Sequence, residues 1–236
     1  MPRIASNIKQ LIVPKGKAPR KIQFGIFKNL IISMDLTSRT QLYLGLYERE
    51  LYPWLEKLSS GIHTAIDIGA NEGEYTLYFL AKTASKKILS FEPSLESQAQ
   101  LRANLALNAL DNDSRLELSA KFVTALDGEH ECTLDSYLAT ISSPCLIKMD
   151  VDGGEVDILR GANQLLQLPS VRWIIETHSQ QLEEQCIEIL NQAGFLTKII
   201  PNSWYRLFIP ELRPTHNRWL VALTKDDAQL HKGFSS

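Results

Sequence analysis

The sequence predicts an α/β fold with a doubly wound, mostly parallel sheet, and two observations lead to this prediction. From residue 64 onward, short apolar runs typical of strands alternate with longer segments that have helical periodicity. A small-residue loop, Asp67 to Gly73, follows the first of these runs, at the position of a strand-to-helix turn. Strand-helix-strand units of this kind pair their strands in parallel, because each helix returns the chain to the same end of the sheet.

The boundaries follow from the same alternation. Strands are expected at 64–68, 87–91, 116–119, 145–149, 171–175, 195–200 and 218–224. Helices are expected at about 74–82, 94–107, 134–140, 155–166 and 180–193. The last two strands have no helix between them, so the final strand should run antiparallel.

An N-terminal extension is expected over residues 1–60, and the main domain over residues 61–236. The first 21 residues carry basic but no acidic side chains, and their apolar residues have helical spacing. This segment is interpreted as a short helix that packs on its own domain or on a partner subunit. A mobile arm and weak contact with an anionic membrane surface are the alternatives.

Two further elements are expected in this extension. Residues 22–27 and 30–34 flank Lys28-Asn29, which predicts a hairpin with a two-residue turn that could roof the substrate pocket. Residues 42–58 predict a helix that is interrupted at Pro53.

The loop after the first strand indicates a cofactor site. Glycine lacks a Cβ atom, so the backbone of such a loop can approach a ligand closely. A dinucleotide fingerprint starting at Gly69 would need glycines at positions 71 and 74, where this chain has Asn71 and Glu74. The cofactor should therefore carry no diphosphate. The expected cofactor-binding residues of the loop are Asp67, Gly69, Ala70, Asn71 and Gly73.

Glu92 completes the expected cofactor site. It follows the second strand, 25 residues after Asp67, where an acidic side chain accepts hydrogen bonds from a ribose diol. Pro93 ends the strand and Ser94 can cap the next helix. A nucleoside without pyrophosphate beside acidic groups suggests S-adenosylmethionine, with Asp67 near its positively charged methionine end.

Five motifs together resemble a known family. They are Asp67-Ile-Gly-Ala-Asn-Glu-Gly, Phe91-Glu92-Pro93, Leu134-Asp135, Lys148-Met-Asp150-Val-Asp152-Gly-Gly-Glu155 and Glu176-Thr-His178. Their order and spacing resemble the FkbM family of S-adenosylmethionine-dependent methyltransferases, over roughly residues 40 to 225. The resemblance implies a class I methyltransferase (Rossmann-like) fold with an antiparallel last strand, and usually methyl transfer to a hydroxyl oxygen.

The reacting groups are expected at the ends of the fourth and fifth strands, namely Asp150, Glu176 and His178. A hydroxyl is a poor nucleophile until its proton is removed, and a histidine with a pKa near ~6.5 suits that task. His178 is therefore the predicted general base, with Glu176 or Asp150 to orient it or to hold the acceptor. The alternatives are an ordinary hydrogen-bonded pair of Glu176 and His178, and a magnesium or manganese ion held by all three residues.

Three neighbouring charged residues have structural interpretations. Asp152 is expected to cap the following helix, and Glu155 suits the dipole of that helix's first turn. Lys148 lies in an otherwise apolar strand, so an ion pair is at least as good an explanation as catalysis.

Composition limits the partners. The net charge is −2, without a basic stripe, so nucleic acid is not an expected partner. The three cysteines lack metal or disulfide spacing, which with the absence of a long apolar run predicts a cytoplasmic protein without stable membrane insertion. The expected partner is a small-molecule or glycan methyl acceptor, and a homo-oligomer is left open. The rival functions are a catalytically silent S-adenosylmethionine-binding scaffold and a nicotinamide-dependent oxidoreductase.

Overall fold

The computed structural model describes residues 14–203, 217–231 and 234. The apolar pattern predicted as a helix at the very N-terminus falls mostly within residues 1–13, outside the described residues. Within the described ranges, every helix is too short or too polar to span a bilayer.

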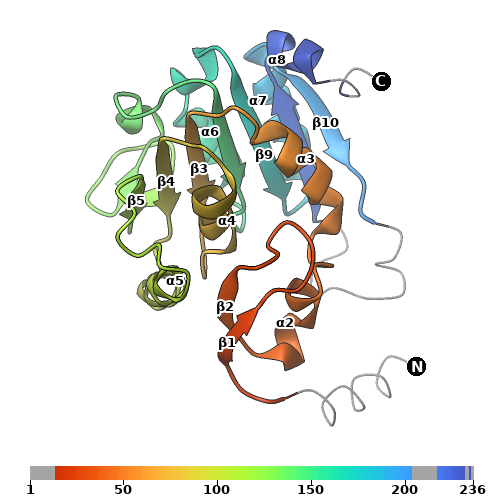
Figure 1. Cartoon of the computed structure of the whole chain (residues 1–236). Helices are drawn as coiled ribbons and strands as arrows, with labels where there is room; N and C mark the ends of the chain where they lie inside the picture. Colours follow the sequence, from red (N-terminus) through yellow and green to blue (C-terminus); the bar gives the residue numbers. More distant parts are fainter. Residues whose placement is uncertain (1–13, 204–216, 232–233, 235–236) are drawn as a thin grey trace.

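The centre of the described structure is a seven-stranded sheet in the order β10-β11-β9-β8-β3-β4-β5 (Figure 1). Its strands are β3 (Thr64–Ile68), β4 (Lys87–Phe91), β5 (Leu116–Ser119), β8 (Cys145–Met149), β9 (Val171–Thr177), β10 (Leu196–Ile200) and β11 (Arg218–Leu223). Strand β11 is antiparallel to both of its neighbours, and the other pairs are parallel. The predicted fold class and the antiparallel last strand are thus confirmed, with strand ends within two residues of expectation.

Helices cover both faces of this sheet (Figure 1). One face packs against α3 (Tyr52–Leu58), α4 (Glu74–Lys82) and α5 (Leu95–Leu107), and the other against α6 (Glu155–Arg160) and α7 (Gln180–Gln192). Side chains of β3 alternate between the two cores, with Ala65 in the first and Ile66 and Ile68 in the second. The short α8 (Lys225–Leu230) follows β11.

Two predicted helices are shorter than expected. In place of 134–140 there is one 3-10 turn, η2 (Asp135–Tyr137), and the N–H groups of Thr140 and Ile141 also bond to carbonyl oxygens three residues back, so the segment continues as tight turns and not as an α-helix. Asp135 accepts hydrogen bonds from the backbone N–H groups of Gln164 and Leu165, both at 2.9 Å, so it caps a second 3-10 turn, η3 (Leu165–Gln167). This contact explains the Leu134-Asp135 motif.

The predicted helix over 155–166 is broken at Gly161. A Cβ atom there would lie 2.1 Å from the carbonyl oxygen of Thr124, so only glycine allows this close approach. Thr124 follows β6 (Phe122–Val123), which pairs with β7 (Glu131–Cys132) in a small parallel sheet.

The predicted hairpin is present, but its turn is wrong. Strand β1 (Ala18–Lys21) pairs antiparallel with β2 (Ile31–Met34), and residues 22–30 form a long loop in place of a two-residue turn. Gly25 and Asn29 have φ angles of 76° and 75°, which bend the loop inward. Ile22 and Phe27 are fully buried by it, so their apolar pattern reflects core packing rather than a strand.

The single interrupted helix over 42–58 is also corrected. The chain forms α2 (Leu36–Tyr43), a 3-10 turn η1 (Arg49–Leu51) and α3. Gly45 and Glu48, with φ angles of 65° and 51°, separate the two helices. Pro53 lies in the first turn of α3, where a missing N–H group costs nothing, so it begins a helix instead of breaking one.

The extension lies beside the cofactor loop, with β1, β2 and α2 below the sheet in Figure 1. Lys17 pairs with Glu72 at 2.8 Å, and Arg39 of α2 pairs with both Glu72 and Glu74. Since the extension also contributes to the first core, the division of the chain at residue 60 stays a prediction.

Candidate active site

The loop from Asp67 to Gly73 joins β3 to α4. Its glycines are needed because other parts of the chain pack closely against them. Gly69 and Gly73 have φ angles of 75° and 95°. A Cβ atom on Gly69 would lie 1.9 Å from the carbonyl oxygen of Asp150, and one on Gly73 would lie 2.8 Å from Cγ of Leu101. Gly69 therefore allows the loop to press against the residue that follows β8, which brings Asp150 next to the expected cofactor site.

The backbone of this loop is tied to the end of β4. The N–H groups of Gly69 and Ala70 both donate to the carbonyl oxygen of Phe91 at 3.0 Å. The N–H group of Asn71, whose φ angle is 47°, donates to Oε2 of Glu92 at 2.8 Å. The two halves of the expected cofactor site are thus in direct contact.

Glu92 is nearly buried and is held from both sides. Its second carboxylate oxygen, Oε1, accepts a hydrogen bond from the N–H group of Ser94 at 2.8 Å. Each carboxylate oxygen has a further lone pair, so Glu92 can still accept hydrogen bonds from a diol. Ser94 caps α5, as predicted, through the N–H group of Ser97.

Glu74 does not contribute to the exclusion of a diphosphate, contrary to the sequence-based expectation. Its side chain is mostly buried and forms an ion pair with Arg39, so its charge is compensated. The exclusion of a diphosphate now depends on Asn71 in the loop and on the carboxylate of Glu92 beside it.

Asp67 and Lys148 form an ion pair in the protein interior. Asp67 is fully buried, and its Oδ2 accepts a hydrogen bond from Oγ1 of Thr76 at 2.7 Å. The Nζ atom of Lys148 lies 3.5 Å from Oδ1 of Asp67 and 3.6 Å from Oδ2 of Asp150. Burial alone would lower the pKa of Lys148, but these carboxylates raise it, so the ammonium stays charged. The ion pair expected for Lys148 is therefore present.

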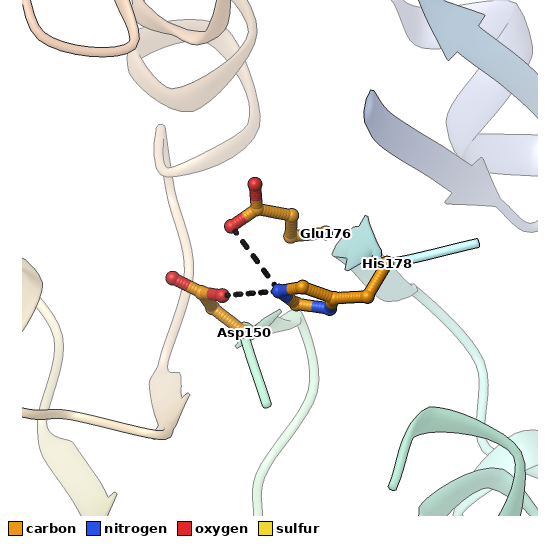
Figure 2. Close-up of side chains that lie close together, drawn as sticks. All are labelled: Asp150, Glu176 and His178. Atoms are coloured by element: carbon orange, nitrogen blue, oxygen red, sulfur yellow. Dashed lines mark ion pairs between the residues drawn. The ribbon is translucent and has the colours of Figure 1, made fainter. Parts of the chain in front are cut away.

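Asp150, Glu176 and His178 converge at the ends of β8 and β9, and Figure 2 shows their side chains pointing toward one another. The Nε2 atom of His178 lies 3.7 Å from Oδ1 of Asp150 and 4.0 Å from Oε2 of Glu176. Glu176 belongs to β9, and His178 follows its last residue, Thr177. The structure therefore brings together the three residues that the sequence pointed to.

The pKa values of Glu176 and Asp150 are shifted in opposite directions. Burial, and then repulsion by Asp150, raises the pKa of Glu176 far above its ordinary value. Burial would also raise the pKa of Asp150, but Lys148 and a hydrogen bond with Glu176 lower it. At neutral pH, Glu176 is therefore protonated and Asp150 ionised.

Glu155 is the site residue that sequence reasoning missed. It is fully buried in the first turn of α6, and its Oε1 lies 2.7 Å from Nδ1 of His178. Sequence reasoning assigned Glu155 only a helix-dipole role. Its place in the motif that begins at Lys148 was the available signal, but a contact with His178 cannot be read from local periodicity.

The prediction that Asp152 caps α6 is wrong. The N-cap position is occupied by Gly154, without a side-chain hydrogen bond. A tight turn, in which the N–H group of Gly153 donates to the carbonyl oxygen of Val151, directs the Asp152 side chain to solvent. From there its Oδ1 lies 3.3 Å from Nε2 of His178.

These acidic neighbours determine the titration of His178. Burial alone would lower the pKa of this imidazole, but the hydrogen bond with Glu155 and the charges on Asp150, Glu155 and Asp152 raise it above its ordinary value. The ring is only partly buried, with 16% of its side chain exposed, so solvent still reaches it.

Comparison with known proteins shows which family this site resembles. Residues 129–225 match the family model described as the methyltransferase FkbM domain. These residues are therefore similar to an FkbM methyltransferase domain. This match confirms the resemblance to the FkbM family and, with it, the expected cofactor S-adenosylmethionine. The matched residues include Asp150, Glu176 and His178, whereas the loop at Asp67 and Glu92 precede them.

Solved structures agree with this similarity at the level of the fold. Methyltransferase FkbM from Methylobacillus flagellatus KT is similar with a TM-score of 0.55 and 18% identity, over 81% of this chain and 56% of that chain. The chain thus spans little more than half the length of that protein. An rRNA methylase from Streptococcus thermophilus is similar with a TM-score of 0.50 and 14% identity, over 75% of this chain and 97% of that chain. Among curated proteins, none matches this chain.

Proposed function

We propose that this protein transfers a methyl group from S-adenosylmethionine to a hydroxyl oxygen of a sugar, a glycan or a secondary metabolite, with His178 as the general base. The observation that supports this most directly is the position of Asp150. Its N–H group donates to the carbonyl oxygen of Ile68 at 3.0 Å, and its own carbonyl oxygen packs against Gly69. The groups that would bind and activate the acceptor therefore start directly beside the cofactor loop.

The residues of the loop fit S-adenosylmethionine. When bound, this cofactor supplies a methyl group on a positively charged sulfur atom. Oδ1 of Asp67 forms an ion pair with Lys148 and has no hydrogen-bond partner among the described residues, and Glu92 retains lone pairs for the ribose hydroxyls. Asp67, the loop from Gly69 to Gly73, and Glu92 are the residues that would hold it.

The triad would then handle the proton of the acceptor. An acceptor hydroxyl in the crevice donates its proton to Nε2 of His178, and the oxygen becomes nucleophilic as the proton leaves. The ionised carboxylate of Asp150 stabilises the resulting imidazolium, since its Oδ1 lies 3.7 Å from that nitrogen. Glu176, protonated at neutral pH, can donate a hydrogen bond that holds Asp150 or the acceptor in place.

Product identification tests this proposal. The purified protein is incubated with methyl-labelled S-adenosylmethionine and fractionated cell extract, and the labelled product is analysed for an O-methyl group. His178→Ala should lower the transfer rate by ~10²–10⁴-fold, the usual contribution of a positioned base. Its matched control is His130→Ala, because His130 is largely exposed and distant in the sequence from the triad. Equal turnover by both variants would show that His178 is structural, and a protein that binds the cofactor without any transfer would favour the silent scaffold.

A metal-assisted transfer is the second candidate, and one observation favours it. One ligand atom from each of Asp150, Glu176 and His178 lies within 4.8 Å of the other two. Two carboxylates and an imidazole can hold magnesium or manganese, which would lower the pKa of the acceptor hydroxyl. With His178 as a base, a chelator should leave the turnover of metal-free protein intact. Activity that is lost with chelator and restored by either metal would instead establish coordination.

The remaining expectations keep their support from composition. Cys132, Cys145 and Cys186 are all free and buried, which agrees with a reducing cytoplasm. The proposal includes a small-molecule or glycan partner, excludes nucleic acid, and leaves a homo-oligomer open. Identification of the labelled product tests which partner is methylated.

A further inference from the structure

A buried carboxylate contacts Nδ1 of His178, the ring nitrogen that Asp150 and Glu176 do not approach. Glu155 has no solvent exposure, and its Oε1 lies 2.7 Å from Nδ1 of the imidazole. We propose that Glu155 positions His178 for catalysis by holding a proton on Nδ1, which leaves Nε2 as the basic atom. This inference rests on the proposed role of His178 as the base.

The geometry assigns the proton. An ionised carboxylate has only acceptor atoms, so an imidazole nitrogen at hydrogen-bond distance from it must carry the hydrogen. With the proton on Nδ1, the neutral ring has its lone pair on Nε2, which lies on the side of Asp150 and Glu176 (Figure 2). Glu155 thereby determines which nitrogen can accept a proton from the acceptor.

The other carboxylates near His178 are not placed to hold a proton on Nδ1. Asp150, Asp152 and Glu176 all approach Nε2, at 3.7, 3.3 and 4.0 Å. Within the part of the chain that the structure describes, Glu155 alone forms an ion pair with Nδ1. Sequence reasoning suggested Glu176 or Asp150 for this orienting role, and the geometry favours Glu155.

The second oxygen of Glu155 indicates that this carboxylate does more than fill space. Oε2 is buried, and none of the described residues forms a hydrogen bond with it. An unsatisfied buried carboxylate oxygen is costly, so an apolar side chain would suit this position better if packing were the only role of Glu155. Its value lies in the transfer step: as the acceptor proton moves to Nε2, both nitrogens carry hydrogen, and Glu155 stabilises the imidazolium from the side opposite the crevice.

Nitrogen-15 NMR of His178 tests the assignment without any need for the acceptor. The wild-type protein is compared with Glu155→Gln, which keeps the size of the side chain but loses its charge. Asp152→Asn is the matched control, since it removes a nearby charge at the exposed end of the ring. The His178 signals are assigned by their absence in His178→Ala.

We expect the wild-type ring to carry its neutral-state proton on Nδ1. In Glu155→Gln the two tautomers should mix, because an amide can either donate or accept, and the pKa of His178 should fall by about one unit or more. Asp152→Asn should leave the tautomer unchanged. If Glu155→Gln does not fold, Glu155→Asp, which withdraws the carboxylate by one methylene, should shift the pKa in the same direction.

An unchanged tautomer and pKa in the folded Glu155 variant would overturn the inference. Failure of the proposed function is read separately, from labelled methyl transfer by His178→Ala. With an acceptor in hand, Glu155→Gln should also move the acid limb of the kcat/KM profile to lower pH while cofactor affinity stays the same.

Discussion

The Nζ atom of Lys148 lies 3.5 Å from Oδ1 of Asp67, and this contact joins two neighbouring strands in the protein interior. The two residues are direct partners in the parallel pairing of β3 with β8. Lys148 is 2% exposed and Asp67 is 0% exposed, so water stabilises neither charge. The two charges are therefore stabilised by each other, by the carboxylate of Asp150 and by the hydrogen bond that Lys148 donates to the carbonyl oxygen of Gly69 at 3.3 Å.

Removal of this ammonium should destabilise the fold. Lys148→Met leaves a buried carboxylate without a cation, so the free energy of unfolding in urea should fall by about 3–5 kcal/mol. The control is Lys87→Met, whose partly exposed pair with Glu117 at 2.7 Å should contribute less than about 1 kcal/mol. Adding Asp67→Asn to Lys148→Met should recover part of the loss. Equal stability of the two lysine variants would contradict this account of the ion pair.

Glu92 should be decisive for cofactor binding. Its carboxylate holds the N–H group of Asn71 and has lone pairs left for the ribose, so Glu92→Ala should weaken binding of S-adenosylhomocysteine by about 1.5–3 kcal/mol in calorimetry. Glu96→Ala, in the first turn of α5 and exposed, should bind like the wild type. NAD should not bind measurably to any of the three proteins, and tight NAD binding would refute the assignment of the loop.

The sheet was predictable from the sequence because its signal is local. Buried parallel strands are short apolar runs, and the glycine loop and the proline after Glu92 mark their ends, so β3 and β4 were placed to the residue. The extension was harder. Ile22 and Phe27 are apolar because a loop buries them, and no strand periodicity could reveal the inward bend at Gly25.

The candidate site was also predictable from the sequence only in part. Asp150, Glu176 and His178 were identified because strand ends in a doubly wound sheet converge on one crevice. Glu155 was not, since its contact with His178 joins residues 23 positions apart through the packing of α6 beside β9. The reason for Gly69 was also inaccessible, because the atom that excludes a Cβ there belongs to Asp150, which follows another strand.

Glu176 should make the protein less stable as the pH rises. Its folded-state pKa is raised, so between pH ~4.5 and that value the unfolded chain releases a proton that the folded chain keeps. The wild type therefore loses stability over this window, whereas Glu176→Gln has nothing to titrate. In urea titrations, the free energy of unfolding of Glu176→Gln should rise relative to that of the wild type as the pH increases, by at most about 1.4 kcal/mol per pH unit. Glu184→Gln, on the exposed side of α7, is the control and should track the wild type. A constant difference between Glu176→Gln and the wild type would show that Glu176 is ionised in the folded protein.

The methyl-transfer rate should fall on the acid side at a pH above ~6.5, the ordinary value for histidine. Protonated His178 cannot accept the acceptor proton, and its pKa is raised by the hydrogen bond with Glu155 and by the charges of Asp150 and Asp152. Because each charge contributes, Asp152→Asn should move the acid limb of the kcat/KM profile to lower pH.

The size of that movement can be judged against Asp157→Asn. Asp157 lies on the same helix as Glu155 but pairs with exposed Arg160, so its loss should leave the acid limb in place. An acid limb that stays in place in Asp152→Asn, or that lies well below pH ~6.5 in the wild type, would mean that the titrating base is a carboxylate. Asp150 would then be the group to test, because its lowered pKa keeps it ionised over the whole neutral range.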